Sequence, residues 1–269
     1  FWHPILKTFL IVYVDDFKMS GSTNNLARGW EKIRKRIKLD KVKPSGRYLG
    51  CQHVVKDNDA GGEMEYDVGS FMKQCCSRYL EVSGLDESSL TPAATPFLPE
   101  ESFTEEDETE AGELREDACK VLMKILYGAR VARFDLLNAT RALASSITKW
   151  SRAADKRLHR LVCYISSTLD HTLQGYVGDP LEDLYLRLYA DADFAGCPKT
   201  SRSTSGVFLC LCGPKTWMPL TAISKKQGCV SHSTPEAELV ALDHALRAEG
   251  LPALTFWETL LGRPVRLVL

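Results

Sequence analysis

The feature that most constrains this chain is a strand that ends in acidic residues, followed further along by a helix that begins with acidic residues. The strand reads Tyr-Ala-Asp-Ala-Asp-Phe-Ala-Gly over 189–196, and the helix begins within Ser-Thr-Pro-Glu-Ala-Glu-Leu-Val-Ala-Leu over 233–242. Between them stand Arg-Ser-Thr-Ser-Gly at 202–206 and Ser-Lys-Lys-Gln at 224–227. Carboxylates from separate elements are the ligands that a pair of hard divalent cations needs, and such pairs cleave phosphodiesters. The pattern predicts an α/β unit with metal-ligating carboxylates at one end of its sheet.

The spacing alone does not say which of these acids would bind a metal. Asp191 and Asp193 are two residues apart in a strand and point to the same side, so periodicity cannot choose between them. On the helix, Glu236 and Glu238 point in different directions, and both lie beside or nearly beside the expected packed stripe. The residues expected to form that stripe are Leu239, Leu242 and Leu246. Acids in a first helical turn also complement the helix dipole without any ligand.

A second acidic signature, Tyr-Val-Asp-Asp at 13–16, lies near the other end of the chain. Residues 9–13 are predicted to form a strand, Asp15 and Asp16 a tight turn, and the chain to return as a strand through Met19. Aspartate favours turns, so an ordinary hairpin tip explains the pair. The apolar run at 10–14 is typical of a buried strand, however, and it places two adjacent charges at its end. This context favours a second metal-ligating pair.

Net charge is −1, but the charges are segregated along the chain. Basic residues concentrate in 28–47 and acidic residues in 100–117. Two predicted helices, 24–38 and 155–169, carry basic faces that can follow a phosphate backbone even in a neutral protein. A face rich in Lys and Arg is equally often simply solvated. The candidate nucleic-acid contacts are Lys32, Arg34, Lys35, Arg36, Lys156, Arg157 and Arg160.

Composition narrows the class of protein further. The chain has 269 residues, enough for about two domains with real cores. The longest apolar run, 9–14, is too short to span a bilayer, and no secretory leader or other targeting signal is visible, so no membrane partner is expected. Nine cysteines without a Cys-x-x-Cys pair favour buried or incidental thiols over zinc or disulfides. These features predict an intracellular protein, cytoplasmic or nuclear.

The order of predicted elements indicates an α+β fold. A strand is expected at 48–55, a turn at 61–62, and a segment at 91–113 with prolines, threonines and acids that is typical of a linker. Further helices are expected at 71–82, at 117–150 with a break near 134–135, at 234–248 and at 251–261. Further strands are expected at 184–192, 206–212, 217–224 and 264–269.

The order and the residues of several motifs resemble those of a known family, which the spacing of the acids alone does not indicate. Residues 189–242 resemble the RNase H domain of copia-type retrotransposon polyproteins, which reads approximately Ser-Asp-Ala-Asp-Trp-Ala-Gly, Arg-Arg-Ser-Thr-Ser-Gly, Ser-Lys-Lys-Gln and Ser-Ser-Thr-Glu-Ala-Glu-Tyr. Upstream, Arg-Phe-Asp at 133–135 is similar to the family's Arg-Pro-Asp, and 156–161 to its Lys-Arg-Ile-Leu-Arg-Tyr-Leu. Tyr-Leu-Gly at 48–50 is similar to its Phe-Leu-Gly, and 13–16 to its polymerase motif Tyr-Val-Asp-Asp. The resemblance covers essentially the whole chain, weakly between about 55 and 115.

The resemblance implies an architecture in four parts. Residues 1–90 would be the end of a reverse transcriptase palm and its thumb, 91–116 an acidic linker, and 117–180 a helical connection. Residues 181–269 would be an RNase H-like α/β domain with a mixed sheet, truncated at its C-terminus.

The resemblance also implies roles for the acids. Asp15 and Asp16 would belong to the polymerase metal site. Asp191 and Glu238 would be RNase H ligands, with Asp193 and Glu236 supporting them at most. The parent protein would hold two Mg²⁺ ions per site, act on an RNA/DNA hybrid or a template–primer, and include the rest of the polyprotein as a partner.

The chain departs from the family at several points. The family's polymerase site takes a further aspartate from before residue 1, and its RNase H site takes further acids from after residue 269. A local insertion is expected at 217–223, and Phe134 replaces a proline. We therefore expect a fragment whose parent copies RNA into DNA and degrades the RNA strand, and which lacks both activities when isolated. The alternative is a decayed or repurposed remnant that only binds nucleic acid or a protein partner.

Overall fold

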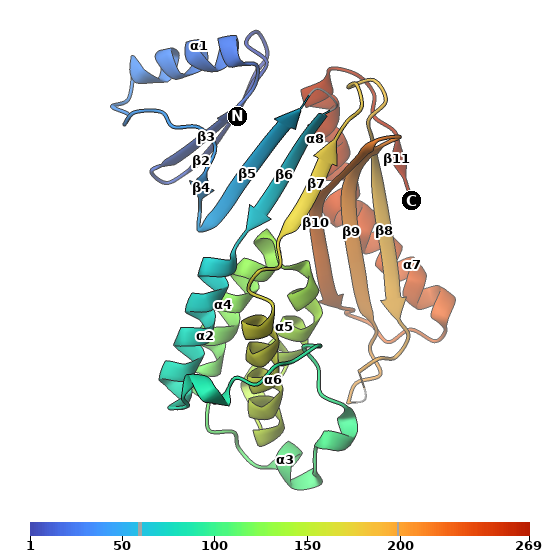
Figure 1. Ribbon diagram of the computed structural model, residues 1–269. Helices are drawn as coiled ribbons and strands as arrows, with labels where there is room; N and C mark the ends of the chain where they lie inside the picture. Colours follow the sequence, from blue (N-terminus) through green and yellow to red (C-terminus); the bar gives the residue numbers. More distant parts are fainter. Residues whose placement is uncertain (59–60, 198) are drawn as a thin grey trace.

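The computed structural model describes residues 1–58, 61–197 and 199–269 and contains two sheets (Figure 1). A small sheet has the order β1-β2-β3, and a larger one has eight strands in the order β11-β8-β9-β10-β7-β6-β5-β4. All pairs are antiparallel except β11 with β8, so the larger sheet is mixed. The fold is therefore α+β with a mixed sheet, as the sequence predicted.

The N-terminal hairpin has β1 (Trp2–His3), β2 (Thr8–Tyr13) and β3 (Asp16–Ser20), followed by α1 (Thr23–Arg34). Tyr13 pairs with Asp16, so the two-residue loop is Val14 and Asp15, one residue earlier than expected. Val14 has a positive φ of 51°, which tight hairpin loops require. The prediction of a buried strand is wrong for its second half, because Ile11 is 40% exposed and the residues through Val14 are exposed as well.

The predicted strand at 48–55 is two strands. β4 (Arg47–Tyr48) and β5 (Cys51–Asn58) form a hairpin through Leu49 and Gly50, which have φ values of 49° and 81°. The turn expected at 61–62 is not at those residues, because Gly61 and Gly62 already pair with β5 as the start of β6 (Gly61–Asp67). The connection between β5 and β6 at 59–60 lies outside the described residues.

A layer of helices packs against one end of the sheet (Figure 1). Its members are α2 (Gly69–Ser83), α4 (Ala118–Val131), α5 (Leu137–Ala144) and α6 (Arg152–Ser167). The break predicted near 134–135 is present, and Arg133 is buried there. Its guanidinium donates to the Thr168 carbonyl at 2.8 Å and pairs with Asp135 at 2.7 Å. This contact joins the break to the end of α6.

The C-terminal part is built on β8 (Tyr185–Asp193), β9 (Thr204–Gly213) and β10 (Thr216–Lys226). The pairing of β10 with β9 slips between Pro219 and Thr221, so the strand bulges within the segment where an insertion was expected. α7 (Thr234–Ala245) and α8 (Leu251–Leu261) are joined by a π-helical turn at 246–250, and β11 (Leu267–Val268) follows. This strand order is compatible with an RNase H-like fold.

β6 and β7 were not predicted, and they join the two halves of the larger sheet. β7 (Leu173–Val177) pairs with β6 on one side and with β10 on the other. The sheet is therefore continuous from β4 to β11, across the expected boundary between 117–180 and 181–269. The division into domains stays a prediction.

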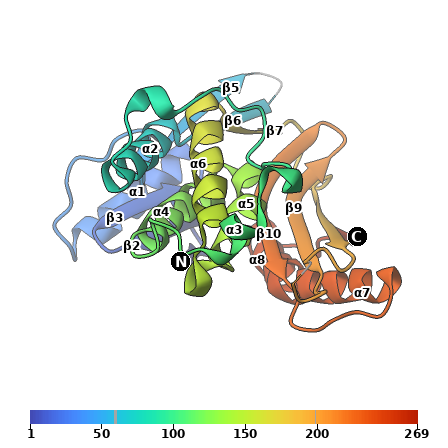
Figure 2. The same ribbon diagram turned by 90° about the horizontal axis from the view of Figure 1, so that it is seen from below.

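The acidic stretch at 91–116 carries two short helices, a 3-10 helix at Glu100–Ser102 and α3 (Glu105–Thr109). Figure 2 shows α3 beside α6, on the outer side of the helical layer. Within the part of the chain that the structure describes, no helix is both long and apolar enough to cross a membrane.

Candidate functional site

The two aspartates at the end of β8 have different surroundings. Alternate residues of β8 before them are buried, and Ala192 packs on α7, so Asp191 and Asp193 lie on the opposite face of the strand. Asp193 accepts a hydrogen bond from the Thr204 amide and so closes the connection into β9. Asp191 is exposed, and its carboxylate has no hydrogen bond or ion pair to another described residue. β11 pairs with β8 only at Leu186 and Arg187, so the strand edge beside Asp191 is open in the described residues.

The two glutamates at the start of α7 differ in the same way. The Ser233 side chain caps the helix by accepting from the Glu236 amide at 3.3 Å, and the Glu236 carboxylate accepts from the His232 amide at 2.8 Å. Glu236 therefore holds the helix start. Glu238 is half-buried and makes no hydrogen bond or ion pair within the described part of the chain.

The packed stripe of α7 agrees only in part with the leucine pattern, in which Leu246 does pack against the core. Ala237, Ala241 and Ala245 are fully buried, whereas Leu239 is 66% exposed. Ala237 and Ala241 pack against Ala192 of β8. Small side chains on both elements let the helix approach the sheet closely, so the expectation for Leu239 was wrong.

The side-chain contacts thus distinguish acids that sequence spacing could not. The carboxylates of Asp193 and Glu236 accept hydrogen bonds from backbone amides in a turn and a helix cap, whereas those of Asp191 and Glu238 make no such bond among the described residues. Both remaining carboxylates are sequence neighbours of the alanines through which α7 contacts β8. Among the described residues, no three His, Cys, Asp or Glu side chains are grouped so as to hold a metal. The residues present therefore do not fit a complete two-metal centre, and no metal-dependent step follows from them.

Asp15 and Asp16 lie apart from that site. Both are exposed at the tip of the β2–β3 hairpin, on the small sheet (Figure 1). The hairpin contacts the larger sheet through Lys18, which bonds to His53 and lies over the Tyr48 ring, and it contacts α8 through Phe9, whose ring lies 5.1 Å from that of Phe256. Burial, with help from Lys18, lowers the pKa of His53 to about 4. The structure brings the two aspartates together but adds no third acid to them among the described residues.

The basic residues of α1 and of the turn after it are open to solvent. The helix ends at Arg34, earlier than the predicted 24–38, so Lys35 is its C-cap and Arg36 lies beyond it. The Lys32 ammonium lies 3.1 Å from His3, and the Arg34 guanidinium reaches the Asp40 carbonyl at 3.4 Å. Lys35 pairs with Glu31 at 3.5 Å, with both side chains 70% exposed. Arg36 has no partner in the described residues. Exposed contacts of this kind contribute little and leave the cations available.

The basic face of α6 is instead covered by the acidic stretch of the same chain. Lys156 pairs with Asp107 at 2.6 Å, and Arg157 pairs with Glu108 at 2.8 Å. Arg160 donates to the Thr95 carbonyl at 2.8 Å. The hydrogen bond from Lys156, followed by bonds within the Thr104 cap, lowers the pKa of Asp107 to about 2. All three α6 residues predicted to contact nucleic acid therefore have internal partners.

A cavity of about 520 Å³ between α2, α6 and residues 85–114 was not predicted from the sequence. Three side chains beside it are connected by hydrogen bonds. The Tyr79 hydroxyl lies 2.9 Å from His159, whose other ring nitrogen lies 3.5 Å from the Cys163 sulfur. Burial raises the pKa of the Tyr79 hydroxyl. The spacing of His159 and Cys163, four residues apart on one helix, was the only available signal.

A second missed residue is Cys197, in the connection from β8 to β9. The Lys226 ammonium donates to its sulfur at 2.9 Å, and this bond lowers the pKa of the thiol to about 7. The Ser-Lys-Lys-Gln motif contains Lys226, but no sequence pattern indicated that Cys197 would be its partner.

The site and fold define an α+β protein with a mixed sheet, two aspartates at the end of β8 and two glutamates at the start of α7. The chain is similar to an uncharacterized mitochondrial protein of Arabidopsis thaliana, with 24% identity over 238 residues. The match covers 87% of this chain and 90% of that protein, so the likeness extends over nearly the whole of both. No protein-family model and no solved structure matches the chain.

Proposed function

We propose that this chain is a fragment of a retrotransposon polyprotein, derived from its reverse transcriptase and RNase H parts. The observation that carries the proposal is the sorting of the acids at β8 and α7. Asp191 and Glu238, the pair that the copia-type motifs select, are the two without a structural task, while Asp193 and Glu236 hold a turn and a cap. The strand order β10-β9-β8-β11 and the full-length likeness to the Arabidopsis protein support the same origin.

The proposed chemistry of the parent is two-metal catalysis. Bound Mg²⁺ pairs there would serve hybrid cleavage at Asp191 and Glu238 and DNA synthesis at Asp15 and Asp16. In the isolated chain each pair lacks further carboxylates, and two carboxylates do not hold two metals in register. The isolated chain therefore binds nucleic acid through its basic surfaces and catalyses neither reaction.

A cleavage assay tests this proposal. The chain is incubated with Mg²⁺ and an RNA/DNA hybrid labelled on the RNA strand, beside the variants Asp191→Asn and Glu238→Gln. We expect salt-sensitive binding of the hybrid by all three proteins and no cleavage by any of them. Robust Mg²⁺-dependent cleavage by the wild-type chain that is abolished by Asp191→Asn would show a competent nuclease.

A second candidate function is that of a decayed or repurposed remnant that binds nucleic acid or a protein partner without catalysis. The open basic face of α1 favours nucleic acid as the ligand. Binding that is unchanged by salt would argue instead for a protein partner, because phosphate contacts weaken steeply as salt is raised.

A further inference from the structure

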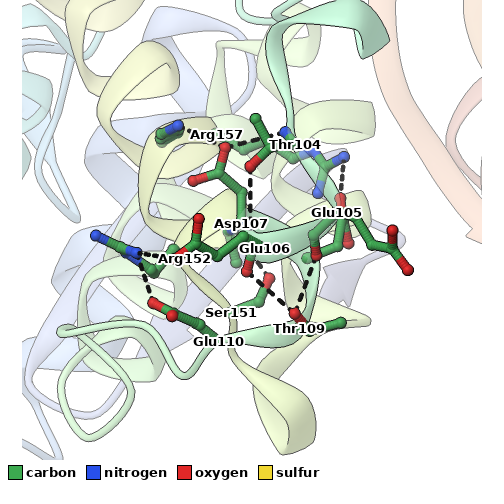
Figure 3. A network of polar contacts seen from close by, with 12 residues as sticks. Thr104, Glu105, Glu106, Asp107, Thr109, Glu110, Ser151, Arg152 and Arg157 are labelled. Atoms are coloured by element: carbon green, nitrogen blue, oxygen red, sulfur yellow. Dashed lines mark hydrogen bonds and ion pairs between the residues drawn. The ribbon is translucent and has the colours of Figure 1, made fainter.

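The acidic segment, defined as residues 95–110, covers the basic face of α6 with unusual completeness. It contains seven acidic residues and no Lys or Arg: Glu100, Glu101, Glu105, Glu106, Asp107, Glu108 and Glu110. Figure 3 shows Glu106 and Glu110 of this segment beside Arg152 of α6. Arg152 pairs with Glu110 at 2.5 Å and lies 3.9 Å from Glu106, and Arg157 also reaches Glu100 at 3.3 Å. Each cation on this face of α6 has its partner in the segment.

The spacing of those cations matches a phosphate backbone. Arg152, Lys156, Arg157 and Arg160 extend over about 12 Å of α6 at the rise of an α-helix. That length corresponds to about three phosphates along one strand of a duplex. Lys199, in the β8–β9 connection, continues the row, because it pairs with Glu108 at 3.0 Å. A strand laid in place of the acidic segment would run from α6 toward the connection that begins at the Asp191 end of β8.

The acidic segment is held firmly at its two flanks and by charge in its middle. On the C-terminal side, Asp155 accepts from the Glu113 amide at 2.6 Å and from the Trp150 indole at 2.6 Å. On the N-terminal side, the Ala93 amide donates to Ser167 at 3.0 Å. Between these points the contacts to α6 are ion pairs and hydrogen bonds: the Arg152 amide donates to the Glu110 carbonyl at 3.0 Å, and Arg160 donates to the Thr95 carbonyl at 2.8 Å. The Phe103 ring lies under the Arg157 guanidinium at 4.0 Å, and Asp107 is buried.

The pairs of Arg152 and Lys199 lie on partly or fully exposed side chains, and Lys156 is half-exposed although its partner Asp107 is buried. An exposed ion pair contributes about 0–1 kcal/mol, so a competing polyanion can replace the exposed pairs without loss of the packed core. The flanking anchors would keep the released segment close to its site. The acidic segment is therefore arranged as a tethered competitor for the cations of α6 rather than as a fixed part of the core.

We propose that the acidic segment occupies, within the same chain, the surface of α6 that binds nucleic-acid phosphates, and that nucleic acid must displace it. The inference rests on the proposed function, because it assumes that α6 contacts a hybrid or template–primer. It adds the regulation of that surface. α6 and Lys199 form one phosphate track that is closed in the free chain.

The test compares two triple variants with the same change in net charge. The open variant carries Asp107→Asn, Glu108→Gln and Glu110→Gln, and the asparagine keeps an oxygen for the Thr104 cap. The control variant carries Glu116→Gln, Glu182→Gln and Asp183→Asn, at exposed positions away from α6. Binding of a short fluorescein-labelled RNA/DNA hybrid is followed by anisotropy at about 0.1 M salt.

We expect the open variant to bind the hybrid at least about tenfold more tightly than the control variant, roughly the effect of one added phosphate contact. Adding Lys156→Gln, Arg157→Gln and Arg160→Gln to the open variant should remove the gain. A chain in which residues 99–110 are replaced by a Gly/Ser linker of equal length should gain affinity as well, which guards against a local effect of the amides.

Equal affinities of the open and control variants would overturn the inference. If both then still bind the hybrid, the proposed function stands without the competitor. Absence of hybrid binding by every variant would overturn both proposals together.

A displacement readout completes the test. Saturating hybrid should speed cleavage of the wild-type chain by a glutamate-specific protease within residues 100–110. Unchanged cleavage at saturation would also contradict displacement.

Discussion

Helices α1 and α6 carry similar basic faces but present them differently. The cations of α1 lie on a helix with a single buried residue, Gly29, and face solvent with few partners. The cations of α6 lie on a helix that packs fully into the core, and their outer side is covered by the acidic segment. The difference teaches that a run of Lys and Arg identifies a charged face but does not say whether the chain itself already occupies it.

The largest expected difference between the two helices is in stability. Leu161 of α6 is fully buried, so Leu161→Ala should lower the free energy of unfolding by about 2–5 kcal/mol. Leu26 of α1 is only partly buried, and Leu26→Ala should cost less than about 1 kcal/mol. Urea unfolding measures both. Equal costs would show that α1 is part of the same cooperative core.

The next effect is on binding by the wild-type chain. Replacing Lys32, Lys35 and Arg36 by Gln should weaken hybrid binding about tenfold and lower its salt dependence, because open cations contact phosphates directly. The same change at Lys156, Arg157 and Arg160 should alter the affinity less than about twofold while the acidic segment is closed. Titrations at several salt concentrations measure both. A larger loss from the α6 variant would contradict the covered face.

Of these two helices, α6 has acidic partners whose pKa is lowered. The pKa of Asp107 lies at about 2, below its ordinary value of 3.8, chiefly because Lys156 donates to it. A carboxylate with a lowered pKa stabilises the folded contact above the unfolded pKa, and that contribution is lost as the pH falls through about 2. The carboxyl carbon shift of Asp107, followed by NMR, should titrate near pH 2, and Lys156→Met should move it upward. Titration of the wild-type residue at its ordinary pKa would show that the pair does not form.

The smallest effect concerns Lys226, a cation whose internal partner is a thiol rather than an acid. Its hydrogen bond lowers the pKa of Cys197 to about 7, so alkylation of this cysteine should reach half its maximal rate near that pH. Lys226→Met should move the midpoint toward the ordinary thiol range. The open variant should leave it unchanged, because none of its substitutions contacts Cys197. A midpoint that does not respond to Lys226→Met would remove the lysine as the cause.

Much of the fold could be read from local patterns. The β2–β3 hairpin, the break near 134–135, and strands β8 to β10 follow from alternation, turn residues and helical periodicity. β6 was not predicted because its two glycines indicated a turn, although the residues that follow them alternate acidic and apolar as a strand does, and β7 is short. Their strand character comes from pairing with each other and with β5 and β10, which no local pattern records.

The candidate site was likewise predictable only in part from the sequence. The motif order selected Asp191 and Glu238, and their roles remain proposals. The structure added that Asp193 and Glu236 hold backbone amides, which needed the positions of Thr204 and His232. It also showed that α7 packs on β8 through Ala237 and Ala241 rather than through Leu239, because small side chains let the two elements approach closely.

The sequence by itself determined most of the helical and extended segments, with β6 and β7 as exceptions. It also determined where the acids and bases concentrate and which motifs point to a retrotransposon origin. These properties depend on neighbours along the chain. Only the tertiary structure decided that the sheet is continuous from β4 to β11, and that residues 95–110 lie on α6. Those outcomes depend on pairing between groups far apart in sequence, where charge and shape become complementary only after the chain has folded.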